Sequence, residues 1–357
     1  MAVRRCLLAL LAVLPAIAGG LLVRWAPETE VPDEYFDKLL QHMRAKADDP
    51  VQQASDCNHL SSLVELTKEQ WEHLKPSPRQ DKALAMGLDL LAIGAMQRFP
   101  SNGIVQKKCS FALKSLAQWN APAFGTLGEH GAIEALAASV QAFPDDPDML
   151  MLAGNIPALT DFKSDPRSQK NLQRLEKTGV AETVLTGMKR FANRSDITLT
   201  GLCFFSNACA PPALNAKMVQ QGYLEDSVEM MRRHGKKVGV SGEVVWLADK
   251  CFSDDEAQLR READAGLLEE VVLTLRAASA GLKTDVIGNE RMFRNAMSLL
   301  GKFARAGDAY RARIVRAGAE AEILAGLSSG LVKPSKACPC LEALRLSLPA
   351  ACLEGKR

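Results

Sequence analysis

The chain has 357 residues, of which 47% are hydrophobic, 24% charged and 5% aromatic. An apolar share of this size can bury a large core, which excludes disorder over most of the chain. The 44 lysines and arginines nearly balance the 42 aspartates and glutamates and leave a net charge of +2. This balance argues against nucleic-acid binding driven by overall charge, and the length alone favours two or three ordinary domains.

Residues 1–23 have the pattern of a targeting segment. Arg4 and Arg5 form a short positive region, and the apolar run Cys6–Ala18 ends on Ala-Ile-Ala, which suits a signal-peptidase site. We therefore expect a cleaved signal peptide. Two alternatives stay open, because Gly19–Val23 lengthens the run enough for an uncleaved signal anchor and because organelle transit sequences share some of these features.

The charges around the apolar run predict where the rest of the chain lies. Two arginines precede the run and one follows it, so the body is expected outside the cytosol. The expected location is the secretory lumen, the extracellular space or a membrane-anchored position facing either, with an organelle as the alternative.

Cysteine usage and one asparagine agree with an oxidising compartment. A cluster near the C-terminus, formed by Cys338, Cys340 and Cys352, could carry a disulfide in an oxidising lumen. The triplet Asn193-Arg194-Ser195 is an acceptor pattern for N-glycosylation in an expected loop, so Asn193 is a glycosylation candidate. Three other cysteines fall inside apolar helical patterns and are expected to be small buried side chains: Cys109, Cys203 and Cys251.

The strongest pattern in the chain is a repeat. A glycine followed by two apolar residues, an acidic residue and an apolar helical run recurs, with variants in the first and last copies. The glycines of the six copies are Gly87, Gly131, Gly179, Gly222, Gly266 and Gly318. A spacing of 43 to 52 residues without strand-like alternation predicts stacked units of three helices. The glycine is expected where two helices meet in a turn that a Cβ would crowd.

Helices are also predicted within and beyond the repeats. The residues after Gly179 predict one apolar stripe: Val180, Val184, Leu185 and Met188. The next helix is expected over Ile197–Ala210, which is apolar nearly all round. The ends lack the glycine and are expected to cap the array, with helices near Tyr35–Leu40, over Leu60–Leu74 and, after a break at Pro334–Cys340, over Leu341–Leu348.

This pattern resembles the armadillo repeat, in which a long third helix carries Trp-x-x-x-Asn along a concave groove. The resemblance covers residues 81–330 and implies an all-α fold, a right-handed α–α superhelix. Residues 28–80 would be degenerate capping helices, and residues 331–357 a C-terminal cap and basic tail. The positions of this chain that match the groove residues, several of them substituted, are Phe111, Ser115, Met151, Asn155, Cys203, Asn207, Trp246, Lys250 and Lys302.

No pattern for catalysis stands out. The sequence has five histidines but no HExxH, no metal-spaced set of cysteines and histidines, no glycine-rich phosphate loop and no nucleophile elbow. We therefore expect no enzyme activity, no cofactor and no metal.

The resemblance implies a non-enzymatic scaffold or adaptor that binds a protein or an extended peptide on the concave face. In the family, the asparagines bond the peptide backbone and the tryptophans form slots between them. Lys250 and Lys302 make one end of this groove positive, which suits an acidic partner and departs from the nuclear-import members, whose cargo is basic. No nucleic-acid partner is expected. Contact with a membrane is expected only if the N-terminal segment stays uncleaved.

Two other functions stay open on the same fold. One is a nucleotide-exchange factor or regulator of a lumenal Hsp70-type chaperone, which combines a signal peptide with armadillo-like repeats. The other is a structural subunit of an organellar complex.

Overall fold

The computed structural model describes residues 32–66, 76–154, 156, 159, 167–208, 216, 218–234, 238–251, 255–280 and 286–353. Over these residues the chain is helical and contains no strand, which confirms the predicted all-α fold. No helix among them is long and apolar enough to cross a bilayer. The predicted targeting segment, residues 1–23, lies outside the described residues.

The described residues divide into two compact units. The first contains the residues up to Phe191 together with Cys203–Ala208. The second contains Ala192–Leu202 and the residues that follow Ala208.

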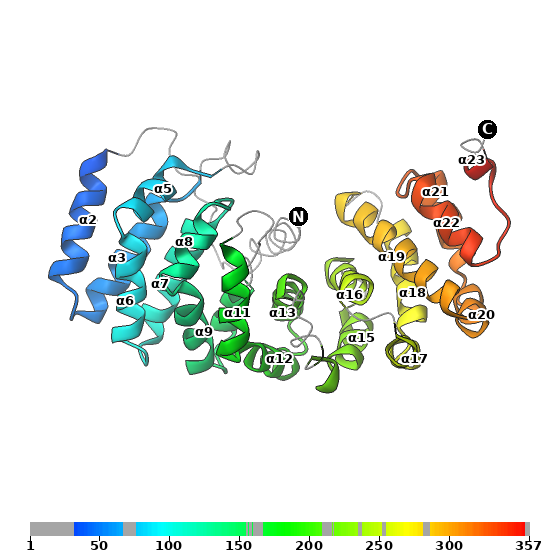
Figure 1. Cartoon of the computed structure of the whole chain (residues 1–357), viewed down its shortest axis with the longest axis horizontal. Coiled ribbons are helices and arrows are strands. Elements are labelled where there is room, and N and C mark those ends of the chain that lie inside the picture. The colour runs from blue at the N-terminus through cyan, green and yellow to red at the C-terminus, as the bar shows by residue number, and fades with distance from the viewer. Residues whose placement is uncertain are drawn as a thin grey trace. The chain divides into compact units, whose positions relative to one another are not determined.

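Within the first unit, successive helices lie beside one another in chain order (Figure 1). They are α2 (Asp33–Ala45), α3 (Pro50–Leu63), α5 (Pro78–Ala85), α6 (Leu88–Arg98), α7 (Gly103–Ala117), α8 (Ala123–Glu129), α9 (Ala132–Ala142), α10 (Pro147–Ala153), α11 (Ser168–Thr178) and α12 (Val180–Arg190).

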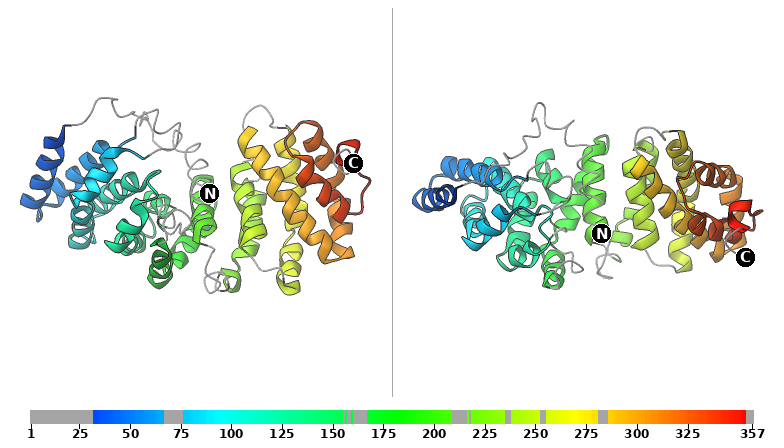
Figure 2. Two further views of the ribbon diagram at one scale, coloured as in Figure 1. Left: turned by 45° about the horizontal axis from the view of Figure 1, so that its top comes forward. Right: turned by 90° about the horizontal axis from the view of Figure 1, so that it is seen from above.

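Helix α13 (Ser195–Ala208) contributes residues to both units. In the second unit, successive repeats again lie beside one another, as both views of Figure 2 show. The helices of this unit are α15 (Tyr223–His234), α16 (Val238–Lys250), α17 (Glu256–Asp264), α18 (Leu267–Ala280), α19 (Val286–Ala306), α20 (Asp308–Arg316), α21 (Ala319–Ser328), α22 (Pro334–Ala343) and α23 (Ala350–Leu353).

The six repeat glycines are confirmed as turn residues between helices. Their φ angles are all positive and lie between +68° and +94°. The expected crowding of a Cβ is found at Gly266 and, to a smaller degree, at Gly318, but not at the other four. Each glycine directly precedes the second helix of its repeat, namely α6, α9, α12, α15, α18 or α21. The third helices that follow are α7, α10, α13, α16, α19 and α22. The chain is therefore built from helical repeats, as the glycine spacing predicts.

The predicted stripe on α12 is also confirmed. Val180, Val184, Leu185 and Met188 are all buried. Helix α13 runs over Ser195–Ala208, close to the predicted span. Such stripes form because residues three and four apart share one helix face, which burial against a neighbour stabilises.

The predicted ends need two corrections. Helix α3 ends at Leu63 and not near Leu74, and residues 67–75 lie outside the described part of the chain. The predicted break at Pro334–Cys340 is wrong, because α22 begins at Pro334 and contains Pro339. Proline suits the first turn of a helix, where its missing N–H is not needed, so Pro334 starts the helix that it was expected to interrupt.

The prediction that Cys109 and Cys251 are buried free thiols is wrong, because both form disulfides. Cys109 forms a disulfide with Cys57, with a Cα–Cα distance of 4.8 Å, and this bond joins α7 to α3. Cys251 is disulfide-bonded as well. An apolar helical pattern predicts burial, but a buried thiol and a buried disulfide give the same pattern.

The remaining described cysteines follow the predictions more closely. Cys338 and Cys352 form the disulfide expected in the C-terminal cluster and link α22 to α23. Cys203 and Cys340 are free and buried. Burial raises the pKa of the Cys340 thiol to about 12, so this thiol stays protonated at neutral pH.

Candidate functional site

The third helices carry two aromatic side chains at equivalent positions. Phe111 on α7 and Trp246 on α16 each lie 24 residues after the glycine of their repeat. Phe111 is 42% exposed and Trp246 is half-buried. Large aromatic side chains that stay accessible on a rigid helix are common anchors in protein–protein interfaces. The repeat therefore places an aromatic side chain that is not fully buried on a third helix of each unit.

In the first unit, Phe111 lies beside a half-buried lysine. The Lys114 Nζ is 5.5 Å from the centroid of the Phe111 ring. Burial lowers the pKa of Lys114 to about 8, because a lysine that has lost part of its water shell holds its proton less tightly. An apolar ring with a cation over it can receive a partner that presents an apolar and an acidic group together.

Ser115 takes part in the packing of α7. Its Oγ is 2.8 Å from the Ser61 Oγ on α3, and its carbonyl accepts a hydrogen bond of 2.6 Å from the Gln80 side chain. The hydroxyl at this predicted groove position is therefore engaged by the neighbouring helix.

In the second unit, polar side chains join α16 to α19 next to the predicted lysines. The Lys302 Nζ donates to the Ala248 carbonyl at 3.3 Å, which brings Lys302 to the end of α16 where Lys250 lies. Asp249 accepts a hydrogen bond of 2.8 Å from Ser298 and is 2.5 Å from the Lys250 Nζ. The structure thus brings the two predicted lysines to the same end of the helix pair.

The same contacts correct the predicted charge of this surface. The Asp249 side chain is only 4% exposed, and its carboxylate compensates the charge of Lys250. Further along the pair, Arg291 of α19 forms an ion pair with Glu243 of α16, which is 1% exposed. The sequence showed the lysines, but only the packing of α19 on α16 shows which acids face them.

Other predicted groove residues are less accessible or lie outside the described part. Cys203 is fully buried and cannot touch a partner. Met151 is half-buried on α10. Asn155 lies outside the described residues, and Asn207 belongs to α13 although its side chain is not among those described.

Within the described ranges, no group of three or more His, Cys, Asp or Glu side chains is placed to hold a metal ion.

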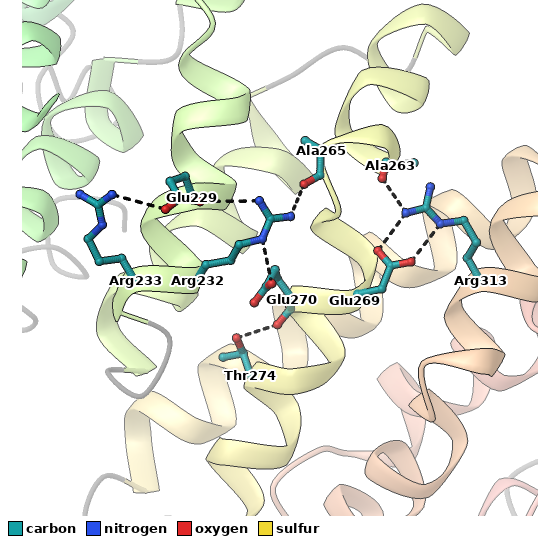
Figure 3. Close-up of polar contacts among 9 residues, drawn as sticks. All are labelled: Glu229, Arg232, Arg233, Ala263, Ala265, Glu269, Glu270, Thr274 and Arg313. Carbon is teal, nitrogen blue, oxygen red and sulfur yellow. Dashed lines mark hydrogen bonds and ion pairs between the residues drawn. The ribbon is translucent and has the colours of Figure 1, made fainter. Parts of the chain in front are cut away.

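A first series of ion pairs links successive repeats. An arginine five residues before a repeat glycine pairs with the glutamate three residues after the preceding repeat glycine. The N–O distances are 3.3 Å for Arg174 with Glu134, 2.7 Å for Arg261 with Glu225 and 2.9 Å for Arg313 with Glu269. Figure 3 shows Arg313, which also donates to the Ala263 carbonyl at 2.7 Å. Each pair ties the first helix of one repeat to the second helix of the one before it.

A second series reaches the glycine turn itself. In two repeats, the residue ten positions after the glycine donates to the carbonyl just before the next repeat glycine: Gln141 to Thr178 at 2.8 Å and Arg232 to Ala265 at 2.5 Å. Arg232 also bonds Glu270 at 3.1 Å (Figure 3). A side chain from one repeat therefore covers the turn of the next.

These two series were missed by the sequence analysis, although their signal was present. The arginines recur at a fixed distance before Gly179, Gly266 and Gly318, and the glutamates at a fixed distance after Gly131, Gly222 and Gly266. Exposed ion pairs contribute only about 0–1 kcal/mol each. Their main effect is thus to fix the position of each repeat on its neighbour, and with it the position of the third helices.

The pKa of Lys114 gives a prediction for this surface. We expect an amine-reactive acylating reagent to modify Lys114 with a half-maximal rate near pH 8, because the neutral amine is the nucleophile and burial lowers its pKa to about 8 from 10.5. Peptide mass spectrometry over a pH series measures the rate, and Lys108 on the same helix is the control. Identical pH profiles for the two lysines would contradict the assignment.

The same shift has a consequence for stability. Between about pH 8 and 10.5, the folded chain has lost the Lys114 proton while the unfolded chain still binds it. Stability therefore rises with pH through this window, and Lys114→Met should remove that contribution.

Comparisons with known proteins assign no family to the chain. No protein-family model matches the chain, and no curated protein matches it. Among solved structures, one engineered protein from the Northeast Structural Genomics Consortium is 15% identical, with a TM-score of 0.45, and the match covers 97% of this chain and 95% of that one. A second engineered protein from the same consortium is 16% identical, with a TM-score of 0.36, and the match covers 88% of this chain and 99% of that one. The class of the chain is that of an all-α helical-repeat protein, defined by its own helices and glycine turns.

Proposed function

We propose that the protein is a non-enzymatic scaffold of the armadillo type, which binds a protein or an extended peptide through its third helices. The observation that carries the proposal is the equivalent placement of Phe111 and Trp246, both accessible on rigid helices. Protein interfaces gain most of their affinity from a few such anchors surrounded by polar contacts. Helical repeats suit this role because each repeat presents the same face.

The partner class follows from the side chains around the anchors. Lys114 lies against Phe111, and in the second unit Lys250 and Lys302 both lie at the end of α16, the helix that carries Trp246. A partner segment with apolar side chains next to acidic ones would complement both surfaces. Because Asp249 already compensates Lys250, we expect acidic groups to add selectivity rather than most of the affinity.

The test is a binding measurement on matched variants. The partner is identified by cross-linking in cells followed by mass spectrometry, then purified and titrated into each variant. We expect Trp246→Ala to weaken binding tenfold or more, since truncating an interface anchor typically costs about 2 kcal/mol or more and about 1.4 kcal/mol corresponds to a factor of ten. Trp246→Phe should retain most of the affinity.

The control residue is Leu273, which is 51% exposed on the second helix α18. Leu273→Ala removes a similarly accessible apolar side chain away from the third helices and should leave the affinity unchanged. Equal affinities for the wild type, Trp246→Ala and Leu273→Ala would show that the third helices are not the binding face.

We also propose that the body of the protein folds in an oxidising compartment of the secretory pathway. The support is the use of disulfides at Cys57–Cys109, at Cys338–Cys352 and at Cys251, since such bonds persist outside the reducing cytosol. A mature protein that begins at Met1 and resides in the cytosol would contradict this location.

A lumenal Hsp70-type chaperone is one partner class that the cross-linking test can return. In that case, the added measurement is nucleotide release from the chaperone. Faster nucleotide release at saturating protein would assign the regulator function. If the release rate does not change, the regulator function is excluded and the scaffold function remains.

A further inference from the structure

Asn193 lies in the turn between α12 and α13, and its side chain is exposed. Helix α12 ends at Arg190, and α13 begins at Ser195. Among the described residues, none forms a hydrogen bond with the Asn193 amide. The amide can therefore be changed chemically without breaking a contact of the fold.

The residues on both sides of Asn193 are held in place. The Ala192 carbonyl accepts a hydrogen bond of 2.8 Å from the His234 Nε2. The Arg194 guanidinium bonds the Asp196 carboxylate at 2.9 and 2.5 Å, and this partner lowers the pKa of Asp196. Because the Arg194 side chain bonds Asp196 in the first turn of α13, it does not cover the Asn193 side-chain amide. The turn presents Asn193 to solvent between two anchored neighbours.

The acceptor triplet and the disulfides of the chain both fit a protein that passes through the compartment of N-glycosylation. Asn193-Arg194-Ser195 is the only Asn-x-Ser/Thr triplet of the sequence. N-linked transfer takes place in the compartment where disulfides form, and the chain has disulfides at Cys57–Cys109 and Cys338–Cys352.

We propose that Asn193 carries an N-linked oligosaccharide. The donor is an oligosaccharide held on a lipid diphosphate. The Asn193 Nδ2 forms a bond to the anomeric carbon, the bond from that carbon to the diphosphate oxygen breaks, and the lipid diphosphate leaves with the electron pair. The amide proton passes to a base of the transferase, and the Ser195 hydroxyl completes the acceptor triplet.

The oligosaccharide has a defined place on the fold. It projects from the start of α13, whereas the predicted groove positions of this helix, Cys203 and Asn207, begin about 12 Å further along at 1.5 Å per residue. The modification is therefore attached at the turn and not at these positions. It does not depend on the proposed binding function.

The test uses the full chain expressed in cells with a secretory pathway. Four forms are compared by intact mass before and after treatment with a peptide-N-glycosidase: the wild type, Asn193→Gln, Ser195→Ala and Ser195→Thr. The wild type and Ser195→Thr should lose a glycan mass on treatment, with Asn193 converted to aspartate. Asn193→Gln and Ser195→Ala should show no loss, and Ser195→Thr controls for the change at the acceptor position.

A wild-type chain with an unmodified Asn193 would overturn the proposal. A non-reducing peptide digest of the same wild-type sample reports the Cys57–Cys109 and Cys338–Cys352 disulfides. If these are oxidised while Asn193 is bare, only the glycosylation proposal fails. If they are reduced as well, the proposed compartment fails with it. The partner titrations with Trp246→Ala are a separate measurement, so failure of the binding function is distinguished from both.

Discussion

Replacing Cys57 and Cys109 together by alanine is expected to lower the free energy of unfolding by about 4 kcal/mol. The disulfide joins residues 52 apart in the chain and connects α3 to α7. In the chain-entropy treatment, a cross-link of this span removes much of the conformational freedom of the unfolded chain, so its loss favours the unfolded state. Urea denaturation of the oxidised protein and of the double variant measures the difference.

The second described disulfide supplies the matched control. Cys338 and Cys352 are only 14 residues apart, so replacing both by alanine should cost about 3 kcal/mol, roughly 1 kcal/mol less. Amide hydrogen exchange should show the two losses in different places, in α3 and α7 for the first variant and in α22 and α23 for the second. An unchanged stability of the Cys57→Ala/Cys109→Ala variant would contradict a stabilising role for this bond.

Gly266→Ala is the second substitution with a large expected effect. Gly266 has a φ of +94°, and a Cβ built there would lie 2.4 Å from the Arg232 Nη2. A left-handed backbone costs an L-residue about 1–2 kcal/mol. Displacing Arg232 also breaks its bond to the Ala265 carbonyl, which adds about 1 kcal/mol. We expect a total loss of about 2–3 kcal/mol in unfolding free energy.

Gly131→Ala separates the two causes. Gly131 has nearly the same φ, +91°, but the nearest atom to its Cβ would be the Glu134 Oε2 at 4.0 Å. This variant should therefore show the backbone cost alone, about 1–2 kcal/mol. In an Arg232→Ala background, Gly266→Ala should cost no more than Gly131→Ala does. If the Arg232→Ala background leaves the cost of Gly266→Ala unchanged, Arg232 does not require the glycine.

The link between Arg232 and Gly266 bears on the proposed function. Repeat arrays are stabilised by contacts between neighbouring repeats, so each contact that fixes one repeat on the next also fixes their third helices. A preformed face loses less conformational entropy on binding than a flexible one. Under the proposed function, the arginine contacts with Glu225, Glu269 and Glu270 would hold the second unit in a conformation ready for binding.

The sequence by itself determined the local structure of the repeats. Gly222 and Gly266 were predicted to lie in turns between helices, and both have a left-handed φ. The stripe on α12 was predicted from the spacing of Val180, Val184, Leu185 and Met188, and all four are buried. These features were readable because a left-handed φ and helical periodicity depend on residues within a few positions of each other.

Only the tertiary structure decided which distant residues meet. The apolar pattern around Cys109 predicted burial but not its bond to Cys57, 52 residues away. Lys250 and Lys302 were predicted to make one end of the groove positive, yet the packing of α19 on α16 bonds Lys302 to the Ala248 carbonyl and brings Asp249 into contact with both Ser298 and Lys250. Local periodicity fixes which side of a helix is buried. The partner on that side depends on how neighbouring repeats pack, and that is decided by contacts such as Arg313–Glu269 between residues more than forty positions apart.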